Sequence, residues 1–485
     1  MEKRTTGYIA NAAGGTLVSG DAGGMVCRVS TDSREAGPGD LFIALKGDRF
    51  DAHCFLETVG RKGVAAVMVE PGHRDEVSAC AMIEVEDTRI AMGRLAGAYR
   101  ADFELPVIAV AGSNGKTTTK ELIAAQLRML GPAHWSEASH NNDVGVPLTL
   151  LKLDSTHRAF VQEIGTNHPG EMRPLIAMTR PSHGVIASIG REHLEHFGDI
   201  AGVVEEQSSL PEMLPADGVL FLPGDDPKAN ELAGRTRARV IRVGFTEGND
   251  WRLRDVRMLG EGMRFSVTGP HGDLEGLEIP LIGRHQVCNA TIALAVGAEL
   301  GLTGEQGRRA LIECPQPKQR LQLWSEGGIR VLDDSYNANA DSMTAGLRTL
   351  AEMPCSGRRI AVLGDMGELG SHSDSAHSEI GTLAGELGID MLFAVGSMAY
   401  RYGGAARAAG LRVVCEFDEA DSATESLGRT LRPGDVLLIK ASRAAALERI
   451  SALLRGKLSP NERRKEVHES GEAIKKQTRT HHVGC

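Results

Sequence analysis

At 485 residues the chain is too long for one hydrophobic core, and about three domains is the natural expectation. Hydrophobic residues make up 41% and charged residues 24% of the chain, as in an ordinary globular protein. The formal net charge of −10 disfavours a nucleic-acid partner, and no apolar run approaches the roughly 18 residues that span a bilayer, so no membrane partner is expected either.

The N-terminus and the cysteines favour a cytoplasmic location. Residues 1–8 lack the apolar core of a signal peptide. The eight cysteines are scattered and include no Cys-x-x-Cys pair, which argues against a disulfide framework or a zinc site. We therefore expect a cytoplasmic protein with reduced thiols.

Residues 1–105 are predicted to form a small α/β domain. Short apolar runs predict strands at 41–45 and 65–69, and an amphipathic pattern predicts a helix at 90–99. Ser33 and Arg34 form a candidate binding turn, because arginine offers a planar donor fork to a phosphate or a uracil edge. A turn whose Asp and Ser side chains cap the backbone explains these residues equally well.

A phosphate-binding turn is predicted directly after an apolar run at residues 107–111, which is typical of a buried parallel strand. Backbone donors, a helix N-terminus, a lysine charge and a hydroxyl for Mg²⁺ together form a cradle for nucleotide phosphates. We expect the nucleotide to be ATP. The predicted nucleotide-binding residues are Gly112, Ser113, Asn114, Gly115, Lys116, Thr117 and Thr118.

The turn departs from the usual P-loop pattern in one position. That pattern has glycine six residues before the lysine, whereas Val110 stands there, and only the shorter Gly112-x-x-Gly-Lys-Thr spacing fits. A glycine-rich turn between strand and helix, without a ligand, is the alternative. A helical pattern from residue 119 supports the phosphate-binding interpretation.

Residues 106–313 are predicted to form a central ATP-binding domain. Helical residues are expected at 148–153, and apolar runs predict strands at 159–164, 184–189, 219–222 and 240–243. Alternation predicts an antiparallel hairpin layer over 250–282, followed by an alanine-rich helix over 283–300.

Two places in this domain carry candidate metal-binding side chains. Glu163 stands at the C-terminal end of a predicted parallel strand, where an open α/β sheet places its chemistry, and could bind Mg²⁺ together with Thr117. A solvated charge at the strand end is the alternative. His193 and His196 could share one helix face and a metal, although such pairs are usually surface residues.

Residues 314–456 are predicted to form a C-terminal domain after a linker marked by Pro315 and Pro317. Alternating strands and helices predict a second open parallel sheet, with strands starting at 331 and 360 and at 391–395, 413–416 and 436–439, and helices at 341–353 and 375–387. Residues 457–485 are polar without apolar periodicity and predict a disordered tail or a frayed helix.

Several separate segments resemble the Mur ligases of peptidoglycan synthesis. They are Ala-Gly-Ser-Asn-Gly-Lys-Thr-Thr at 111–118, Asn-Asn-x-x-Gly-x-Pro at 141–147, Glu163-x-Gly, His193-Leu-Glu, Asn289-Ala and Asp-Asp-Ser-Tyr-Asn-Ala-Asn at 333–339. Within the family, residues 334–343 and 364–370 resemble the members that add D-alanyl-D-alanine. The Asp-Asn-Pro-Arg segment typical of the diaminopimelate-adding members does not occur in the sequence.

The resemblance implies an α/β protein of three domains. These are a small UDP-binding domain, a central P-loop parallel-sheet ATPase domain and a Rossmann-like domain that brings the amino substrate. It implies an ATP-dependent ligase that joins D-alanyl-D-alanine to UDP-N-acetylmuramoyl-tripeptide through an acyl phosphate and releases ADP and phosphate. Both substrates are small molecules, and a monomer is expected.

The resemblance also implies roles for individual residues. Lys116, Glu163 and His193 are the implied catalytic residues, with Thr117 and Glu163 on a first Mg²⁺ and His193 on a second. The implied ATP contacts are Asn289, Arg320 and Asp334, and the implied substrate contacts are Ser33, Arg34, Asn141 and Asn142.

Three positions depart from the family pattern. Gln286 stands where Asn is common and Ala340 where Pro is common, and neither alters the interpretation. Gln207, 14 residues after His193, stands where the family carries a carbamylated lysine that bridges the second Mg²⁺. Because glutamine is neutral and shorter, we expect a second metal held mainly by His193 and phosphate oxygens, with a water-bridged contact from Glu206. Activity should need high Mg²⁺ and be indifferent to bicarbonate, and Glu206→Ala should be more harmful than Gln207→Ala.

Two other functions remain open on the sequence alone. One is another amide ligase of the same architecture, such as a folylpolyglutamate synthase or a sister Mur ligase. The other is a non-catalytic ATP-binding regulator, which Gln207 would favour and the intact Lys116, Glu163 and His193 disfavour.

Overall fold

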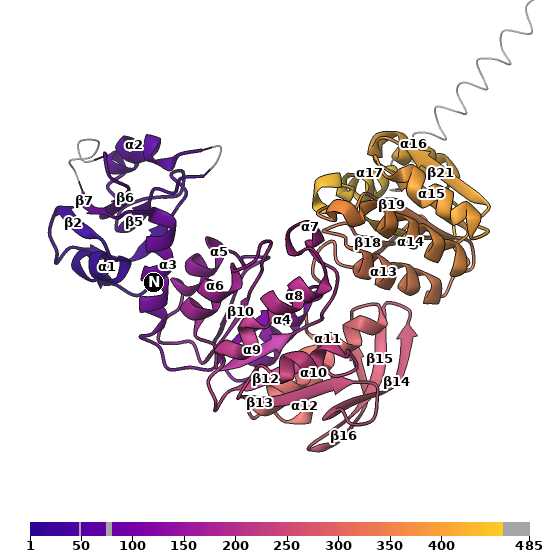
Figure 1. Cartoon of the computed structure of the whole chain (residues 1–485), viewed down its shortest axis with the longest axis horizontal. Helices are drawn as coiled ribbons and strands as arrows, with labels where there is room; N and C mark the ends of the chain where they lie inside the picture. The colour runs from indigo at the N-terminus through magenta and orange to yellow at the C-terminus, as the bar shows by residue number, and fades with distance from the viewer. Residues whose placement is uncertain (48–49, 74–79, 459–485) are drawn as a thin grey trace, which may run out of the picture.

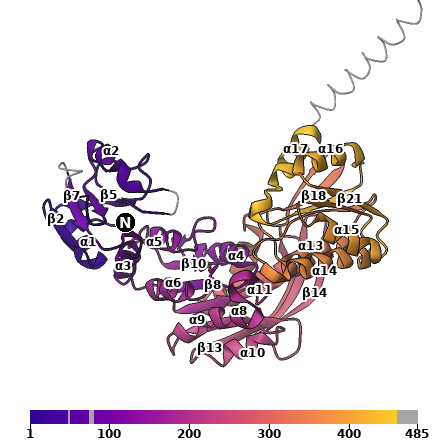
Figure 2. The same cartoon turned by 45° about the horizontal axis from the view of Figure 1, so that its top comes forward.

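The computed structural model describes residues 1–47, 50–73 and 80–458, which form three lobes, each built on one large sheet (Figure 1). We name them the N-terminal, central and C-terminal lobes after their order in the chain. In both views the N-terminal and C-terminal lobes lie on opposite sides of the central lobe (Figures 1 and 2). The predicted polar tail lies outside the described residues from residue 459 onward.

The N-terminal lobe has a five-stranded sheet of order β2-β7-β6-β5-β4. Its strands are β2 (Thr16–Ser19), β4 (Arg28–Ser30), β5 (Asp40–Ile43), β6 (Ala66–Val69) and β7 (Ala81–Glu84), and a separate ribbon pairs β1 (Arg4–Thr5) with β3 (Met25–Val26). Its helices are α1 (Thr6–Ala13), α2 (Leu56–Arg61) and α3 (Thr88–Arg100). The predicted strands at 41–45 and 65–69 and the helix at 90–99 are confirmed, with small shifts in their ends.

Helix α3 joins the N-terminal lobe to the central lobe. Asp87 starts the helix by accepting hydrogen bonds from the backbone N–H groups of Arg89 and Ile90. The buried Tyr99 donates its hydroxyl to the carbonyl of Leu153, 2.6 Å away, in the central lobe. One continuous hydrophobic cluster contains side chains of both lobes around this helix.

The central lobe has a nine-stranded sheet of order β16-β15-β14-β13-β12-β11-β8-β10-β9. Its strands are β8 (Val107–Ala111), β9 (Ala133–Trp135), β10 (Ala159–Glu163), β11 (His183–Ile186), β12 (Val219–Pro223), β13 (Arg239–Gly244), β14 (Trp251–Leu259), β15 (Gly262–Gly269) and β16 (Gly272–Ile279). The adjacent pairs from β9 to β14 in this order are parallel, whereas β14 with β15 and β15 with β16 are antiparallel, which confirms the hairpin layer.

Helices cover both faces of this sheet. They are α4 (Lys116–Arg128), α5 (Gly145–Leu150), α6 (Met172–Thr179), α7 (Leu194–Phe197), α8 (Ile200–Gln207), α9 (Ser209–Met213), α10 (Lys228–Ala233), α11 (Arg284–Glu299) and α12 (Gly304–Ile312). In β8, Val107, Ala109 and Ala111 face one hydrophobic cluster, and Ile108 and Val110 face another. Because both faces of β8 are buried, its sequence is continuously apolar instead of alternating.

Two helices begin earlier than the apolar pattern predicted. Helix α4 begins at Lys116 instead of residue 119, because its first turn is polar and Gly115 in the left-handed region (φ +81°) precedes it. Helix α5 begins at Gly145 instead of residue 148, with Pro147 in its first turn, where a missing N–H costs no hydrogen bond.

The C-terminal lobe has a six-stranded sheet of order β17-β18-β22-β19-β20-β21. Its strands are β17 (Gln322–Glu326), β18 (Ile329–Asp334), β19 (Arg359–Gly364), β20 (Met391–Val395), β21 (Val413–Phe417) and β22 (Val436–Lys440). Its helices are α13 (Ala340–Glu352), α14 (Ser373–Glu386), α15 (Ala399–Ala408), α16 (Ala420–Thr430) and α17 (Glu448–Leu458). The predicted parallel sheet is confirmed, and β17 adds an antiparallel edge strand that was not predicted.

A largely buried ion pair lies at the carboxyl ends of β18 and β22, where this sheet faces the cavity. The parallel register of β18 and β22 sets Asp334 beside Lys440, and the Lys440 ammonium lies 2.6 Å from the Asp334 carboxylate. Lys440 also donates to the carbonyl of Asn337, 3.0 Å away. Burial raises the pKa of Asp334 above its usual range, and the Lys440 charge opposes that shift.

We expect Lys440→Met to lower the free energy of unfolding by about 3–5 kcal/mol, because it leaves the Asp334 carboxylate in a buried place without its cation. A guanidinium titration measures the change. The matched control is Arg443→Met, which removes a largely exposed cation from the next turn of chain and should shift stability by less than about 1 kcal/mol. Equal effects of the two substitutions would contradict a stabilising role for the buried pair.

Candidate active site

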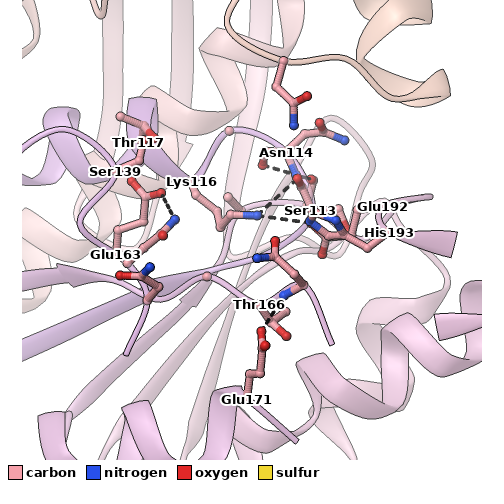
Figure 3. A pocket seen from close by; sticks show the side chains of 18 of the residues that line it. Ser113, Asn114, Lys116, Thr117, Ser139, Glu163, Thr166, Glu171, Glu192 and His193 are labelled. Atoms are coloured by element: carbon pink, nitrogen blue, oxygen red, sulfur yellow. Dashed lines mark hydrogen bonds and ion pairs between the residues drawn. The ribbon is translucent and has the colours of Figure 1, made fainter. Parts of the chain in front are cut away.

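A cavity of about 1550 Å³ lies where the three lobes meet. Helix α3 lines it from the N-terminal lobe, and the turn after β8 lines it from the central lobe. The loop between β18 and α13 lines it from the C-terminal lobe. Figure 3 shows the side chains around the phosphate-binding turn.

The turn after β8 has glycine at the two positions where the backbone requires it. Gly112 has φ +116°, and a Cβ there would lie 2.7 Å from the carbonyl oxygen of Ser188. Gly115 has φ +81°, and a Cβ there would lie 3.1 Å from the Asn289 side chain. Val110, where the longer pattern has glycine, lies inside β8, so the turn starts only after Ala111.

The turn is bound to the loop that follows β11. The Ser113 hydroxyl donates to the carbonyl of Gly190 (3.0 Å) and accepts from the N–H of Gly190 (2.9 Å). The N–H of Asn114 donates to the Ser188 hydroxyl, 2.8 Å away. These contacts hold the turn in the shape that an anion at the start of α4 requires.

Lys116, the first residue of α4, reaches back over the turn. Its ammonium lies 2.5 Å from the carbonyl oxygen of Gly112 and 3.3 Å from that of Ser113. It also forms an ion pair with Glu192, at 3.2 Å (Figure 3). A phosphate bound in the turn would offer the ammonium a stronger acceptor than these carbonyl oxygens.

Thr117 and Glu163 fit the first Mg²⁺ that the sequence predicts. Both side chains are buried and line the cavity, and among the described residues neither Thr117 Oγ1 nor Glu163 Oε2 has a hydrogen-bond partner. The other Glu163 oxygen accepts from Asn141 Nδ2, 2.8 Å away, which orients the carboxylate. A hydroxyl and a carboxylate are the hard oxygen ligands that Mg²⁺ prefers beside phosphate oxygens and waters.

The described residues contain no cluster of three or more His, Cys, Asp or Glu side chains that could hold a metal alone. Such a cluster is not required for Mg²⁺, which usually keeps several waters and takes ligands from a bound nucleotide.

His193 and His196 have different contacts, and a metal shared by the two stays a prediction. His193 lies just before α7 with φ +48°, and its Nδ1 is 2.5 Å from the Glu368 carboxylate of the C-terminal lobe. This hydrogen bond lowers the pKa of Glu368. The His196 ring instead packs on His168, with ring centroids 4.2 Å apart. His193 alone of the two lines the cavity.

Polar side chains of the C-terminal lobe contact the central lobe across the cavity. The Arg320 guanidinium lies 4.0 Å from the centroid of the Tyr336 ring and donates to the Ser139 hydroxyl (3.3 Å). The Tyr336 hydroxyl donates to the same oxygen at 2.9 Å. Asn339 Nδ2 donates to Asn114 Oδ1 at 3.0 Å, which connects α13 to the phosphate-binding turn.

A second contact between these lobes is ionic. Arg191 lies 2.8 Å from the Asp341 carboxylate and 2.7 Å from that of Glu379. Sequence reasoning did not single out Arg191, Ser139 or Tyr336. Tyr336 lies within the segment 333–339, and Ser139 lies two residues before the segment 141–147, both of which carry the family resemblance. This proximity is the sequence feature that could have indicated a role for the two residues.

The other predicted nucleotide contacts line the cavity. Asn289 and Asp334 both do so, and Asn289 Nδ2 donates to Gln286 Oε1, 3.0 Å away. The glutamine that departs from the family pattern therefore holds Asn289 through a hydrogen bond.

The predicted substrate residues divide into two groups. Asn141 and Asn142 line the cavity, and Asn142 Oδ1 also accepts from the N–H of Gly145 at the start of α5. Ser33 and Arg34 are not among the residues that line it. Arg34 is largely exposed and forms an ion pair with Asp32 at 2.6 Å. The part of the N-terminal lobe that lines the cavity is α3.

The hypothesis that Glu206 substitutes for the family's carbamylated lysine is wrong. Its carboxylate accepts from the N–H groups of Gly170 (2.7 Å) and Met172 (2.8 Å), and it is not among the residues that line the cavity. Glu206 therefore fixes the loop that leads into α6. Gln207 Nε2 points elsewhere and donates to Glu192.

These features define a P-loop nucleotide-binding enzyme whose site is completed by a separate lobe. A family model for the "Mur ligase middle domain" matches residues 110–297, and one for the "Mur ligase, glutamate ligase domain" matches residues 319–443. A curated protein of Bacillus subtilis (strain 168), named UDP-N-acetylmuramoyl-tripeptide--D-alanyl-D-alanine ligase, is 34% identical over 93% of this chain and 98% of its own length. The chain belongs to the Mur ligase family and is an ATP-dependent ligase.

Solved structures agree with this assignment. A crystal structure of MurF from Acinetobacter baumannii has a TM-score of 0.86 and 32% identity, over 94% of this chain and 99% of that one. MurF ligase from Thermotoga maritima in complex with ADP has a TM-score of 0.79 and 26% identity, over 89% and 97%. The predicted three-part α/β fold is confirmed. Among the described residues, no helix has the length and apolarity to cross a membrane.

We expect Lys116→Ala to reduce turnover by about 10²–10³-fold or more, because it removes the ammonium that lies over the predicted phosphate-binding turn. Phosphate release at saturating substrates measures the effect. The thermal midpoint should stay close to that of the wild type, since the Lys116 side chain lies over a turn and not in a hydrophobic core.

The matched control is Lys152→Ala. Lys152 is a half-exposed lysine of the same lobe that pairs with Glu137, and its removal should leave turnover unchanged. Near-normal activity of Lys116→Ala would refute the assignment of the phosphate-binding turn.

Proposed function

We propose that this chain joins D-alanyl-D-alanine to UDP-N-acetylmuramoyl-tripeptide, with ATP converted to ADP and phosphate, in peptidoglycan precursor synthesis. The observation that carries the proposal is the shared cavity in which the Lys116 turn faces side chains of the C-terminal lobe. A ligation of three reactants needs such a meeting point, because holding reactants together removes most of the entropic barrier. Relatives that match almost the whole chain carry this activity in their names.

The chemistry follows in two steps. An oxygen of the tripeptide's terminal carboxylate attacks the γ-phosphorus of ATP, the bond to the ADP oxygen breaks, and an acyl phosphate forms. The amine of D-alanyl-D-alanine then attacks the acyl carbon, loses a proton, and phosphate leaves with the electrons of the carbon–oxygen bond. Both reactants of the first step are anions, so the site must supply positive charge.

The turn after β8 and Lys116 supply part of that charge. The N–H groups at the start of α4 would donate to the phosphates, and the Lys116 ammonium would pair with the outer phosphate in place of the carbonyl oxygens of the turn. Thr117 and Glu163 would hold Mg²⁺, which supplies further positive charge beside the phosphates when bound. Asn141 keeps the Glu163 carboxylate in one orientation.

We assign the remaining roles by the same reasoning. Arg320, Asp334 and Asn289 contact ATP from the two sides of the cavity, Asn141 and Asn142 lie toward the peptide substrate, and His193 lies toward a second cation. Ser33 and Arg34 bind the UDP end of the substrate. The proposed domain bounds are 1–105, 106–313 and 314–456, and we propose a monomeric protein of the cytoplasm.

A coupled assay tests the proposal. Purified protein with ATP, Mg²⁺, UDP-N-acetylmuramoyl-tripeptide and D-alanyl-D-alanine should release phosphate, and omission of either substrate should abolish release. Release with a single amino acid, or with a folate and glutamate, but not with the dipeptide would instead identify a different amide ligase. ATP binding without release under any of these substrate pairs would indicate a regulator.

The position of Ser33 and Arg34 generates a further prediction. Because these residues lie outside the cavity while α3 lines it, a substrate bound at both places should draw the N-terminal lobe inward. Small-angle X-ray scattering should show a smaller radius of gyration with nucleotide and UDP-substrate than without. Arg34→Ala should make the decrease in the radius of gyration smaller when the UDP-substrate is limiting. A radius of gyration that stays unchanged at saturating substrate would contradict the inward movement of the N-terminal lobe.

A further inference from the structure

The Glu192 carboxylate lies in the cavity but has no role in the proposed reaction steps. It is buried, with 3% of the residue exposed, and it lines the cavity beside Lys116. One of its oxygens lies 3.2 Å from the Lys116 ammonium, and the other accepts a hydrogen bond from Gln207 Nε2 at 2.9 Å. In the view of Figure 3, Lys116 lies between Glu192 and Glu163.

Gln207 holds this carboxylate in place. It is the last residue of α8, it is 1% exposed, and its amide nitrogen is directed at Glu192. Its amide oxygen is buried and has no hydrogen-bond partner among the described residues. A neutral amide orients a carboxylate without neutralising it, so Lys116 is the cation that the described contacts give to Glu192.

Nucleotide binding would separate Lys116 from Glu192. Lys116 must turn toward the phosphates, and Glu192 then remains as a buried carboxylate close to further negative charge. A buried carboxylate without a cation is costly, and a second anion beside it raises the cost. A divalent cation between Glu192 and the phosphate oxygens removes both penalties.

His193 offers a second protein ligand at the same place. It is adjacent to Glu192 in sequence and lines the same cavity. Its Nδ1 is engaged by Glu368 at 2.5 Å, which fixes the ring and leaves Nε2 on the opposite edge. A histidine whose other nitrogen is held by a carboxylate is a common arrangement for a metal ligand.

We propose that Glu192, oriented by Gln207, supplies the carboxylate for a second divalent cation beside the nucleotide phosphates, with His193 as its partner ligand. The inference rests on the proposed function, because the nucleotide supplies the remaining ligands. Gln207 is a positioning residue in this arrangement. A primary amide is not carbamylated as an amine is, so the site needs neither carbon dioxide nor bicarbonate.

Mn²⁺ binding tests the proposal with the full chain. Free Mn²⁺ is followed by electron paramagnetic resonance during titration of the protein with a non-hydrolysable ATP analogue. The wild type should bind a second Mn²⁺ in addition to the one at Thr117 and Glu163. Glu192→Gln should weaken the second site by about 100-fold or more, and Gln207→Leu by about 10–100-fold.

Two further variants complete the series. Glu205→Gln, on the exposed side of α8, removes a carboxylate that pairs with Arg235 and should leave both sites unchanged. The exchange Glu192→Gln with Gln207→Glu keeps the hydrogen bond between the two positions and returns a carboxylate, so it should restore part of the second site. Circular dichroism identifies any variant that fails to fold, and Glu192→Asp then replaces it, with an expected intermediate affinity.

The outcomes are distinguishable. If Glu192 only pairs with Lys116, Glu192→Gln should tighten binding of the ATP analogue and keep the second Mn²⁺, and this result would overturn the proposal. Turnover that requires added bicarbonate would also overturn it. Absence of any Mn²⁺ bound with the analogue in the wild type, together with no phosphate release, would instead refute the proposed function.

Discussion

The close approach of the β8 turn to the loop after β11 is the constraint on which the site depends. Gly112 passes so near the backbone of Ser188 that no side chain fits between them. This contact sets where α4 begins and therefore where Lys116 and Thr117 point. The same loop continues to Glu192, so one backbone contact places the phosphate-binding turn and the carboxylate opposite it.

The C-terminal lobe completes the site through polar contacts. Asn339 contacts the turn through Asn114, and Asp341 pairs with Arg191 in the loop after β11. These side chains remain partly exposed, and beside them Leu194, Phe197, Val203 and Ile282 of the central lobe are buried in a hydrophobic cluster of the C-terminal lobe. The site is therefore assembled between two lobes that are joined by apolar as well as polar contacts.

Local patterns predicted the sheets and the phosphate-binding turn, because β8 and its neighbours are apolar on both faces and the glycines stand where the turn requires them. The sequence did not reveal β17, whose alternation is weak at a partly exposed edge. Glu192 directly precedes His193 in the sequence, and only His193 belongs to the family motif. The hydrogen bond of Glu192 with Gln207 depends on how α8 packs, so Gln207 was interpreted as an isolated departure.

Whether Arg34 contacts a ligand also depends on the packing of distant elements. Its residue type predicted a binding role, but whether it meets a ligand depends on the angle between lobes, and no local pattern encodes that angle. Asn141 and Asn142, by contrast, follow directly from the short loop before α5. Residues placed by local turns were predictable, whereas residues placed by the packing of distant elements were not.

The hydrophobic cluster around α3 has a consequence for the folding of the chain. Because it contains side chains from both the N-terminal and central sheets, these two lobes should melt together as one cooperative unit. One of the two main clusters of the C-terminal lobe lies within that lobe, whereas the other also contains Leu194, Phe197, Val203 and Ile282 of the central lobe, so the unfolding of these two lobes is coupled as well. Calorimetry would then resolve fewer transitions than there are sheets, and a fragment ending before α3 would lack part of its own core.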